Sequence, residues 1–113
     1  MEEKFIRPWG WYENIIEETG YKVKRIFVEE GQKISLQYHE HRSEHWIVVQ
    51  GSGKVELDGN IKDVGLGDYI FIPILGKHRI CGGSCGIMIV EVQMGSSCVE
   101  EDIIRLEDDY GRN

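Results

Sequence analysis

The chain has 113 residues, which indicates one domain, and its 20 acidic and 13 basic residues give a net charge of −7. This charge excludes nonspecific binding to nucleic acid, which needs a basic surface, but not binding of a small phosphate ester by a few focused cations. No apolar run approaches the roughly 18 residues of a membrane-spanning helix. Three cysteines cannot all pair, and no secretion signal is recognisable at the N-terminus, so we expect reduced thiols in the cytoplasm.

Alternating apolar and polar residues predict strands along most of the chain. The segments "WYENII" and "YKVKRIFV" flank "EETG" and predict a hairpin, and "KISLQYHEH" predicts the next strand over residues 33–41. Residues 44–50 form a further strand that ends at "GSG". The segments "KVEL" and "IKDV" flank "DGN", a strong hairpin signal because glycine accepts a positive φ.

The second half of the chain continues this pattern. Separate strands are predicted for residues 69–74, 78–80 and 86–93, and the acidic tail from residue 99 predicts either a short helix or an edge strand. Strands that recur every 8–12 residues or so, with glycine turns between them, favour a β-sandwich or a β-barrel.

Three of the four histidines lie between Leu36 and Trp46. His39 and His41 share one face of the predicted strand, with Cα atoms about 6.5 Å apart, so both can reach one metal ion. Glu44 begins the next strand, where an antiparallel neighbour brings its carboxylate opposite the histidines. His45 points the other way in a regular strand, so we take Glu44 as the ligand. The alternative is a polar strand end with solvated histidines.

The spacing of these residues resembles the two motifs of the cupin barrel. Gly31, His39, His41, Glu44 and Gly51 match the first motif, and Gly67, Pro73 and His78 match the second. The flanking segments "RPWGWYE", "IPILGKHRI" and "EEDIIRLEDDYGR" resemble the C-terminal cupin domain of type II mannose-6-phosphate isomerases over nearly the whole chain. This resemblance implies an all-β jelly-roll barrel of two antiparallel sheets, a single cupin domain over residues 1–113 with its motifs at about 31–51 and 67–82.

The same resemblance implies a metal-dependent isomerase that interconverts mannose 6-phosphate and fructose 6-phosphate. It implies a divalent metal held by His39, His41, Glu44 and His78. Gln37 is a fourth or alternative ligand, because Gln37 and His39 resemble a ligand pair of type I phosphomannose isomerases. Such ligands admit Zn²⁺, Mn²⁺, Fe²⁺, Co²⁺ or Ni²⁺, so the sequence does not name the metal.

The isomerase reaction also needs a base and positive charge for the phosphate. Glu91 lies in an apolar strand and is either the base or half of a structural ion pair. Lys24 shares a face with residues that line the predicted barrel, so it is assigned to catalysis or substrate binding. Arg42 and Arg79 are further substrate-binding candidates, and Arg105 or Arg112 could close over the pocket.

Other functions are compatible with a cupin, because fold does not fix function. One alternative is a noncatalytic cupin that binds a sugar or nucleotide sugar, and another is a dioxygenase. In the resembled family the domain follows a mannose-1-phosphate guanylyltransferase domain, so a separate guanylyltransferase is an expected partner. An exposed N-terminal strand that pairs edge to edge predicts a homodimer.

Overall fold

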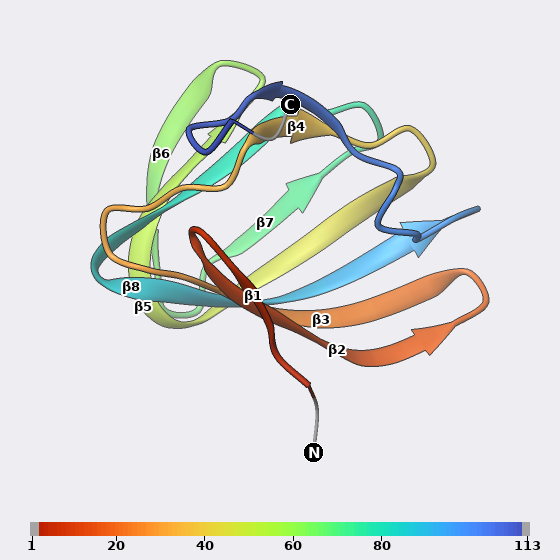
Figure 1. Cartoon of the computed structure of the whole chain (residues 1–113), viewed down its shortest axis with the longest axis horizontal. Coiled ribbons are helices and arrows are strands. Elements are labelled where there is room, and N and C mark those ends of the chain that lie inside the picture. Colours follow the sequence, from red (N-terminus) through yellow and green to blue (C-terminus); the bar gives the residue numbers. More distant parts are fainter. Residues whose placement is uncertain (1–2, 112–113) are drawn as a thin grey trace.

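Figure 1 shows the computed structural model, which describes residues 3–111 and contains nine strands and no helix in that range. No segment of the described chain is therefore a helix that could cross a membrane. The strands are β1 (Phe5–Arg7), β2 (Gly10–Glu18), β3 (Tyr21–Val28), β4 (Leu36–Tyr38), β5 (Arg42–Leu57), β6 (Asn60–Gly65), β7 (Tyr69–Ile72), β8 (His78–Gly95) and β9 (Ile104–Glu107).

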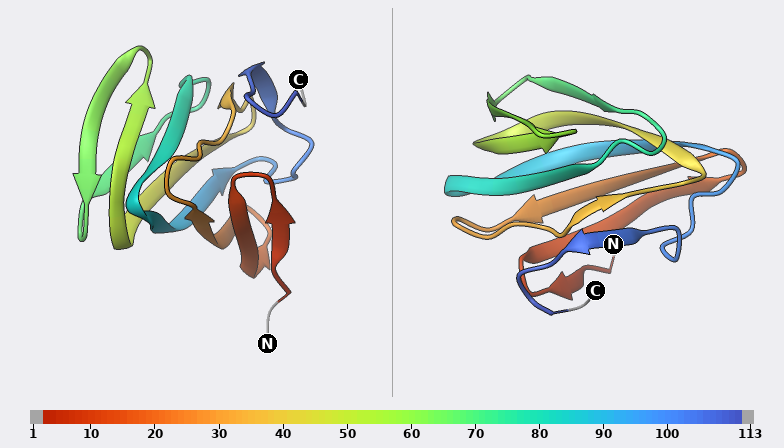
Figure 2. Two further views of the ribbon diagram at one scale, coloured as in Figure 1. Left: turned by 60° about the vertical axis from the view of Figure 1, so that its left-hand side comes forward. Right: turned by 90° about the horizontal axis from the view of Figure 1, so that it is seen from above.

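The strands form two antiparallel sheets that are joined through β5 and β8. The first sheet has the order β1-β2-β3, then the C-terminal half of β8, the N-terminal half of β5, and β7. The second has the order β9-β4, then the N-terminal half of β8, the C-terminal half of β5, and β6. Figure 1 shows β4 and β9 on one side of the molecule and β2 and β3 on the opposite side, and Figure 2 shows the same curled arrangement from two further directions.

The long strands pass from one sheet to the other at a pair of glycines. Gly51 in β5 has φ 77° and Gly86 in β8 has φ 78°, a region that favours glycine. A Cβ atom on Gly51 would lie 2.1 Å from the Gly86 carbonyl oxygen, so the two backbones meet where no side chain fits. The prediction of separate strands over residues 44–50 and 54–57, and over residues 78–80 and 86–93, is therefore wrong, because glycine lets β5 and β8 bend without ending.

The inner faces of both sheets form one core. Its most deeply buried side chains are Val28, Trp46, Val48, Ile72, Ile80, Ile87 and Ile89, each 1% exposed or less. On β3, alternation places Lys22, Lys24 and Val28 on the buried face, as predicted for Lys24. The acidic tail forms the edge strand β9 beside β4, whereas the strand predicted over residues 33–41 shortens to β4.

Candidate metal centre and its pocket

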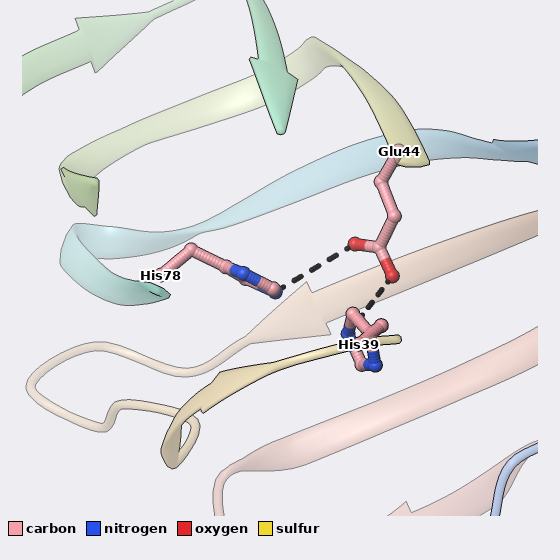
Figure 3. Close-up of side chains that lie close together, drawn as sticks. All are labelled: His39, Glu44 and His78. Atoms are coloured by element: carbon pink, nitrogen blue, oxygen red, sulfur yellow. Dashed lines mark ion pairs between the residues drawn. The ribbon is translucent and has the colours of Figure 1, made fainter. Parts of the chain in front are cut away.

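Two histidines and one carboxylate converge inside the barrel (Figure 3). His39 follows β4, Glu44 lies in the N-terminal half of β5, and His78 is the first residue of β8. His39 Nε2 lies 3.1 Å from Glu44 Oε2, and His78 Nε2 lies 3.8 Å from Glu44 Oε1. One ligand atom from each residue lies within 4.8 Å of the others, and all three side chains are buried.

Backbone hydrogen bonds orient both imidazoles toward this point. His39 Nδ1 donates to the Asp102 carbonyl oxygen at 2.5 Å, and His78 Nδ1 donates to the Gly76 carbonyl oxygen at 2.8 Å. A carbonyl oxygen can only accept, so Nδ1 of each ring carries the proton and Nε2 faces the cluster. Neutral Nε2 atoms held in this way, together with a carboxylate, are a donor set that fits a divalent transition metal.

Gln37 lies next to this cluster, since it pairs in register with His78 and lines the same cavity. Its Nε2 group donates to the Ser35 carbonyl at 3.2 Å and to Ser35 Oγ at 2.9 Å. The amide oxygen is therefore the atom that Gln37 can offer to a metal.

The structure does not bring His41 to the cluster. β4 ends at Tyr38, so the alternation that would place His41 on the same face as His39 does not continue, and the His41 side chain is exposed. His45 lies on the outer face, where its Nδ1 atom is 2.6 Å from the Tyr69 hydroxyl. The expected choice of Glu44 over His45 agrees with this geometry.

A second carboxyl group, Glu91, lies beside Glu44. The Trp46 indole N–H donates to both groups, at 3.1 Å to Glu44 Oε1 and 3.1 Å to Glu91 Oε2. Gln93 Nε2 donates to the other Glu91 oxygen at 3.1 Å. Glu91 is 3% exposed and lines the cavity, so it is a buried acid next to the metal-ligand set.

The surroundings give the two carboxyl groups opposite pKa shifts. Burial, followed by the negative charge of Glu44, raises the pKa of Glu91 well above its usual range. Burial alone would raise the pKa of Glu44 as well, but hydrogen bonding with Glu91 and the neighbouring imidazoles of His39 and His78 hold it well below its usual range. Burial lowers the pKa of His78, although the charge of Glu44 opposes this shift. Glu44 is therefore the carboxylate suited to a cation, and Glu91 is the carboxyl group of the pair with the higher affinity for a proton.

Arg42 is also buried at the cluster, and each of its three guanidinium nitrogens donates to a protein atom. Nε donates to Glu44 Oε2 at 2.9 Å, Nη1 to the Val99 carbonyl at 3.0 Å, and Nη2 to His39 Nε2 at 3.3 Å. This arrangement favours a role in holding Glu44 and His39 over a role as a substrate anchor.

The cluster forms one wall of a cavity of about 180 Å³. Since a water molecule occupies about 30 Å³ in the liquid, the cavity has room for a small organic molecule. The charged residues that line it are Arg7, Lys24, Arg42, Glu44, Glu91, Glu100 and Arg105.

The cations at the cavity differ in how they are engaged. Lys24 Nζ lies 3.0 Å from Glu100 Oε2 and 4.0 Å from the centre of the Tyr12 ring. Arg105 Nε is buried without a hydrogen-bond partner. Arg105 lines the cavity, and its Nε group has donor capacity left for a ligand. Arg112, the alternative, lies outside the described residues.

Arg79, in contrast, does not line the cavity. Its Nη1 group contacts Glu107 Oε1 at 2.6 Å, and its Nε group donates to the Ile34 carbonyl at 2.9 Å. The sequence analysis names Arg79 as a substrate-binding candidate, but Arg79 follows the cavity residue His78 on a strand, so its side chain points to the other face. The sequence analysis missed Arg7 and Glu100, whose places depend on how the two chain ends fold back over the cavity.

Comparisons with known proteins assign the family. Residues 1–108 match the family model described as "Mannose-6-phosphate isomerase C-terminal". The chain is 44% identical over 113 residues to mannose-1-phosphate guanylyltransferase from Escherichia coli, with 99% of this chain and 24% of that protein aligned. It is 44% identical over 107 residues to alginate biosynthesis protein AlgA from Pseudomonas aeruginosa, covering 94% of this chain and 22% of AlgA. The chain thus spans about a quarter of the length of these relatives.

Solved structures show the same fold at low sequence identity. Oxalate decarboxylase from Bacillus subtilis matches with a TM-score of 0.84 and 20% identity over 93% of this chain and 30% of that chain. KdgF from a Halomonas species matches with a TM-score of 0.79 and 16% identity, covering 89% of both chains. The barrel is a cupin, and the chain belongs to the family of mannose-6-phosphate isomerase C-terminal domains.

Proposed function

We propose that the chain is a metal-dependent mannose-6-phosphate isomerase, which interconverts mannose 6-phosphate and fructose 6-phosphate by moving a proton between C1 and C2 through a cis-enediol. Family membership supports this proposal. The observation that carries it is the convergence of His39, Glu44 and His78 in one buried cavity with the carboxyl group of Glu91.

His39, Glu44 and His78 are the residues proposed to hold the metal, with the Gln37 oxygen as a further ligand. A divalent ion bound there supplies a Lewis acid that polarises the sugar carbonyl and stabilises the negative charge that develops on its oxygen. His41 is left out of this set because its side chain is exposed and directed away from the cavity.

Glu91 is proposed to move the proton between C1 and C2. In its ionised form Glu91 is the base, and burial raises its pKa, so it accepts the proton from one carbon and then returns it to the neighbouring carbon. The Trp46 and Gln93 donors hold both Glu91 oxygens in place, so the group is oriented before substrate arrives.

Lys24 and Arg105 are proposed to bind the phosphate and sugar oxygens. Both line the cavity, and Arg105 Nε has no partner within the described chain. Arg105→Ala should raise KM for mannose 6-phosphate with a smaller change in kcat, because the phosphate does not take part in the proton transfer.

A coupled isomerase assay tests the proposal on metal-stripped protein with each divalent ion restored in turn. Activity should return with one ion and be lost in His39→Ala and His78→Ala. Glu91→Gln should lower turnover roughly 10²- to 10⁴-fold while metal content stays the same. His45→Ala and His41→Ala are matched controls that should retain activity, since both side chains lie outside the cavity. Metal binding without turnover on any hexose phosphate would refute the isomerase.

The alternative function is a noncatalytic cupin that binds a sugar or nucleotide sugar beside a separate guanylyltransferase. It is favoured by relatives that are named mannose-1-phosphate guanylyltransferase and are about four times as long as the aligned region. Copurification with a guanylyltransferase chain from the same cells, together with unchanged ligand affinity in Glu91→Gln, would support this second function. A homodimer formed through the edge strand β1 remains a prediction for either function.

A further inference from the structure

Asp102 makes three contacts with the chain segment that carries His39. It lies in the stretch between β8 and β9 and is 8% exposed. Its Oδ1 atom accepts the backbone N–H of Glu40 at 3.0 Å, and its Oδ2 atom accepts the backbone N–H of His41 at 2.9 Å. Its own carbonyl oxygen accepts His39 Nδ1–H at 2.5 Å.

These contacts fix both the position and the protonation of the His39 ring. The carboxylate holds the two residues that follow His39, where β4 has ended and no strand pairing fixes the backbone. The carbonyl holds the proton on Nδ1, so Nε2 faces Glu44. Removal of such outer contacts typically costs 10- to 100-fold in metal affinity.

We propose that Asp102 is the positioning residue of the metal site, acting through His39 without touching the metal or the substrate. This inference rests on the metal site of the proposed function but not on turnover. Glu40, His41 and Asp102 also lie close enough together to hold a cation. Both Asp102 carboxylate oxygens already accept backbone N–H groups, however, and the side chains of Glu40 and His41 are exposed. The Asp102 carboxylate therefore fixes the backbone after His39 and is not assigned to a second cation site.

Val99 and Glu100 of the same segment contact cations at the cavity or next to it. The Val99 carbonyl accepts a hydrogen bond from Arg42 at 3.0 Å, and Glu100 Oε2 lies 3.2 Å from Lys22 Nζ and 3.0 Å from Lys24 Nζ. Asp102 differs from these residues because its carbonyl oxygen contacts the proposed metal ligand His39 and its carboxylate holds the two residues that follow it. Its replacement should therefore act on the metal rather than on the cavity in general.

The test compares Asp102→Asn with the matched control Glu101→Gln, the neighbouring exposed carboxylate. Asparagine has the same shape as aspartate, but its NH₂ group replaces one of the two carboxylate oxygens. The backbone N–H of either Glu40 or His41 therefore loses its acceptor. Titration with Co²⁺, followed by visible absorbance, should show a 10- to 100-fold weaker Kd in Asp102→Asn and the wild-type Kd in Glu101→Gln. Equal Kd values in wild type and Asp102→Asn would overturn the proposal.

A second measurement uses metal-free protein and does not depend on metal binding. Long-range ¹H–¹⁵N NMR spectra of the histidine rings report which nitrogen carries the proton. His39 should be protonated on Nδ1 in wild type and should show a mixture of tautomers in Asp102→Asn, while His78 should keep its Nδ1 proton in both. An unchanged His39 tautomer, or equal changes at His39 and His78, would refute a specific action on His39. Wild-type protein that bound no Co²⁺ would instead refute the metal site, and the NMR result would still decide the role of Asp102.

Discussion

Arg42 and Glu44 form a buried ion pair whose loss can be measured separately from catalysis. The Arg42→Ala change removes three hydrogen bonds, to Glu44, the Val99 carbonyl and His39, and leaves the Glu44 carboxylate without its cation. Both side chains are nearly inaccessible, at 5% and 2% exposure. Loss of one partner of a buried pair costs about 3–5 kcal/mol, because the remaining charge stays buried without compensation.

Urea unfolding of chelated protein at neutral pH measures this effect. With a slope of about 2 kcal/mol per molar urea, the Arg42→Ala midpoint should fall by about 1.5–2.5 M. The double variant Arg42→Ala/Glu44→Gln should lose less than the sum of the two single variants, by about 1–3 kcal/mol. The exposed pair Lys54–Asp63, at 2.6 Å, is the control, and Lys54→Ala should leave the midpoint unchanged. A loss below about 1 kcal/mol for Arg42→Ala, or strict additivity, would refute the interpretation of Arg42 as the group that holds Glu44.

Two further changes test other parts of the structure. Burial alone would raise the pKa of Glu100, but Lys24 and Lys22 lower it below the usual 4.5. A lowered pKa stabilises the fold while the group is ionised, so wild type should be more stable than Glu100→Gln above pH 4.5 and should lose this advantage as pH falls through the lowered pKa. Thermal melts from pH 3 to pH 7 or so check this, and a difference that grows toward acid would contradict it. Gly51→Ala should cost at least about 2 kcal/mol in urea unfolding, because its Cβ meets the Gly86 carbonyl at a positive φ. Gly59→Ala, also at a positive φ but with open space around it, should cost clearly less.

Sequence reasoning predicts well what depends on local pattern. The hairpins around residues 19–20 and 58–59 follow from glycine turns between alternating segments. The inward direction of Lys24 follows from alternation within a regular strand, and the residue lines the cavity. His39, Glu44 and His78 were identified through motif spacing, and the structure brings them together.

The same reasoning fails where the strand pattern is interrupted. The alternation that predicts His41 beside His39 ends at Tyr38, and Asp102, near the C-terminus, holds the backbone there. Arg79 was expected at the substrate, but β9 supplies Glu107 as its partner on the other face. Contacts between residues far apart in sequence decide both cases, and no short pattern encodes them.

The metal-ligand set also connects the two sheets of the barrel. Glu44 belongs to the part of β5 that pairs in the first sheet, whereas His78 belongs to the part of β8 that pairs in the second. An ion bound by both residues would link the two sheets across the interior of the barrel. The ion would have to be released before the sheets could separate. Metal content would then control how fast the domain unfolds, and amide protons of β4 and β5 would exchange with solvent more slowly, and in concert, in the metal-loaded protein.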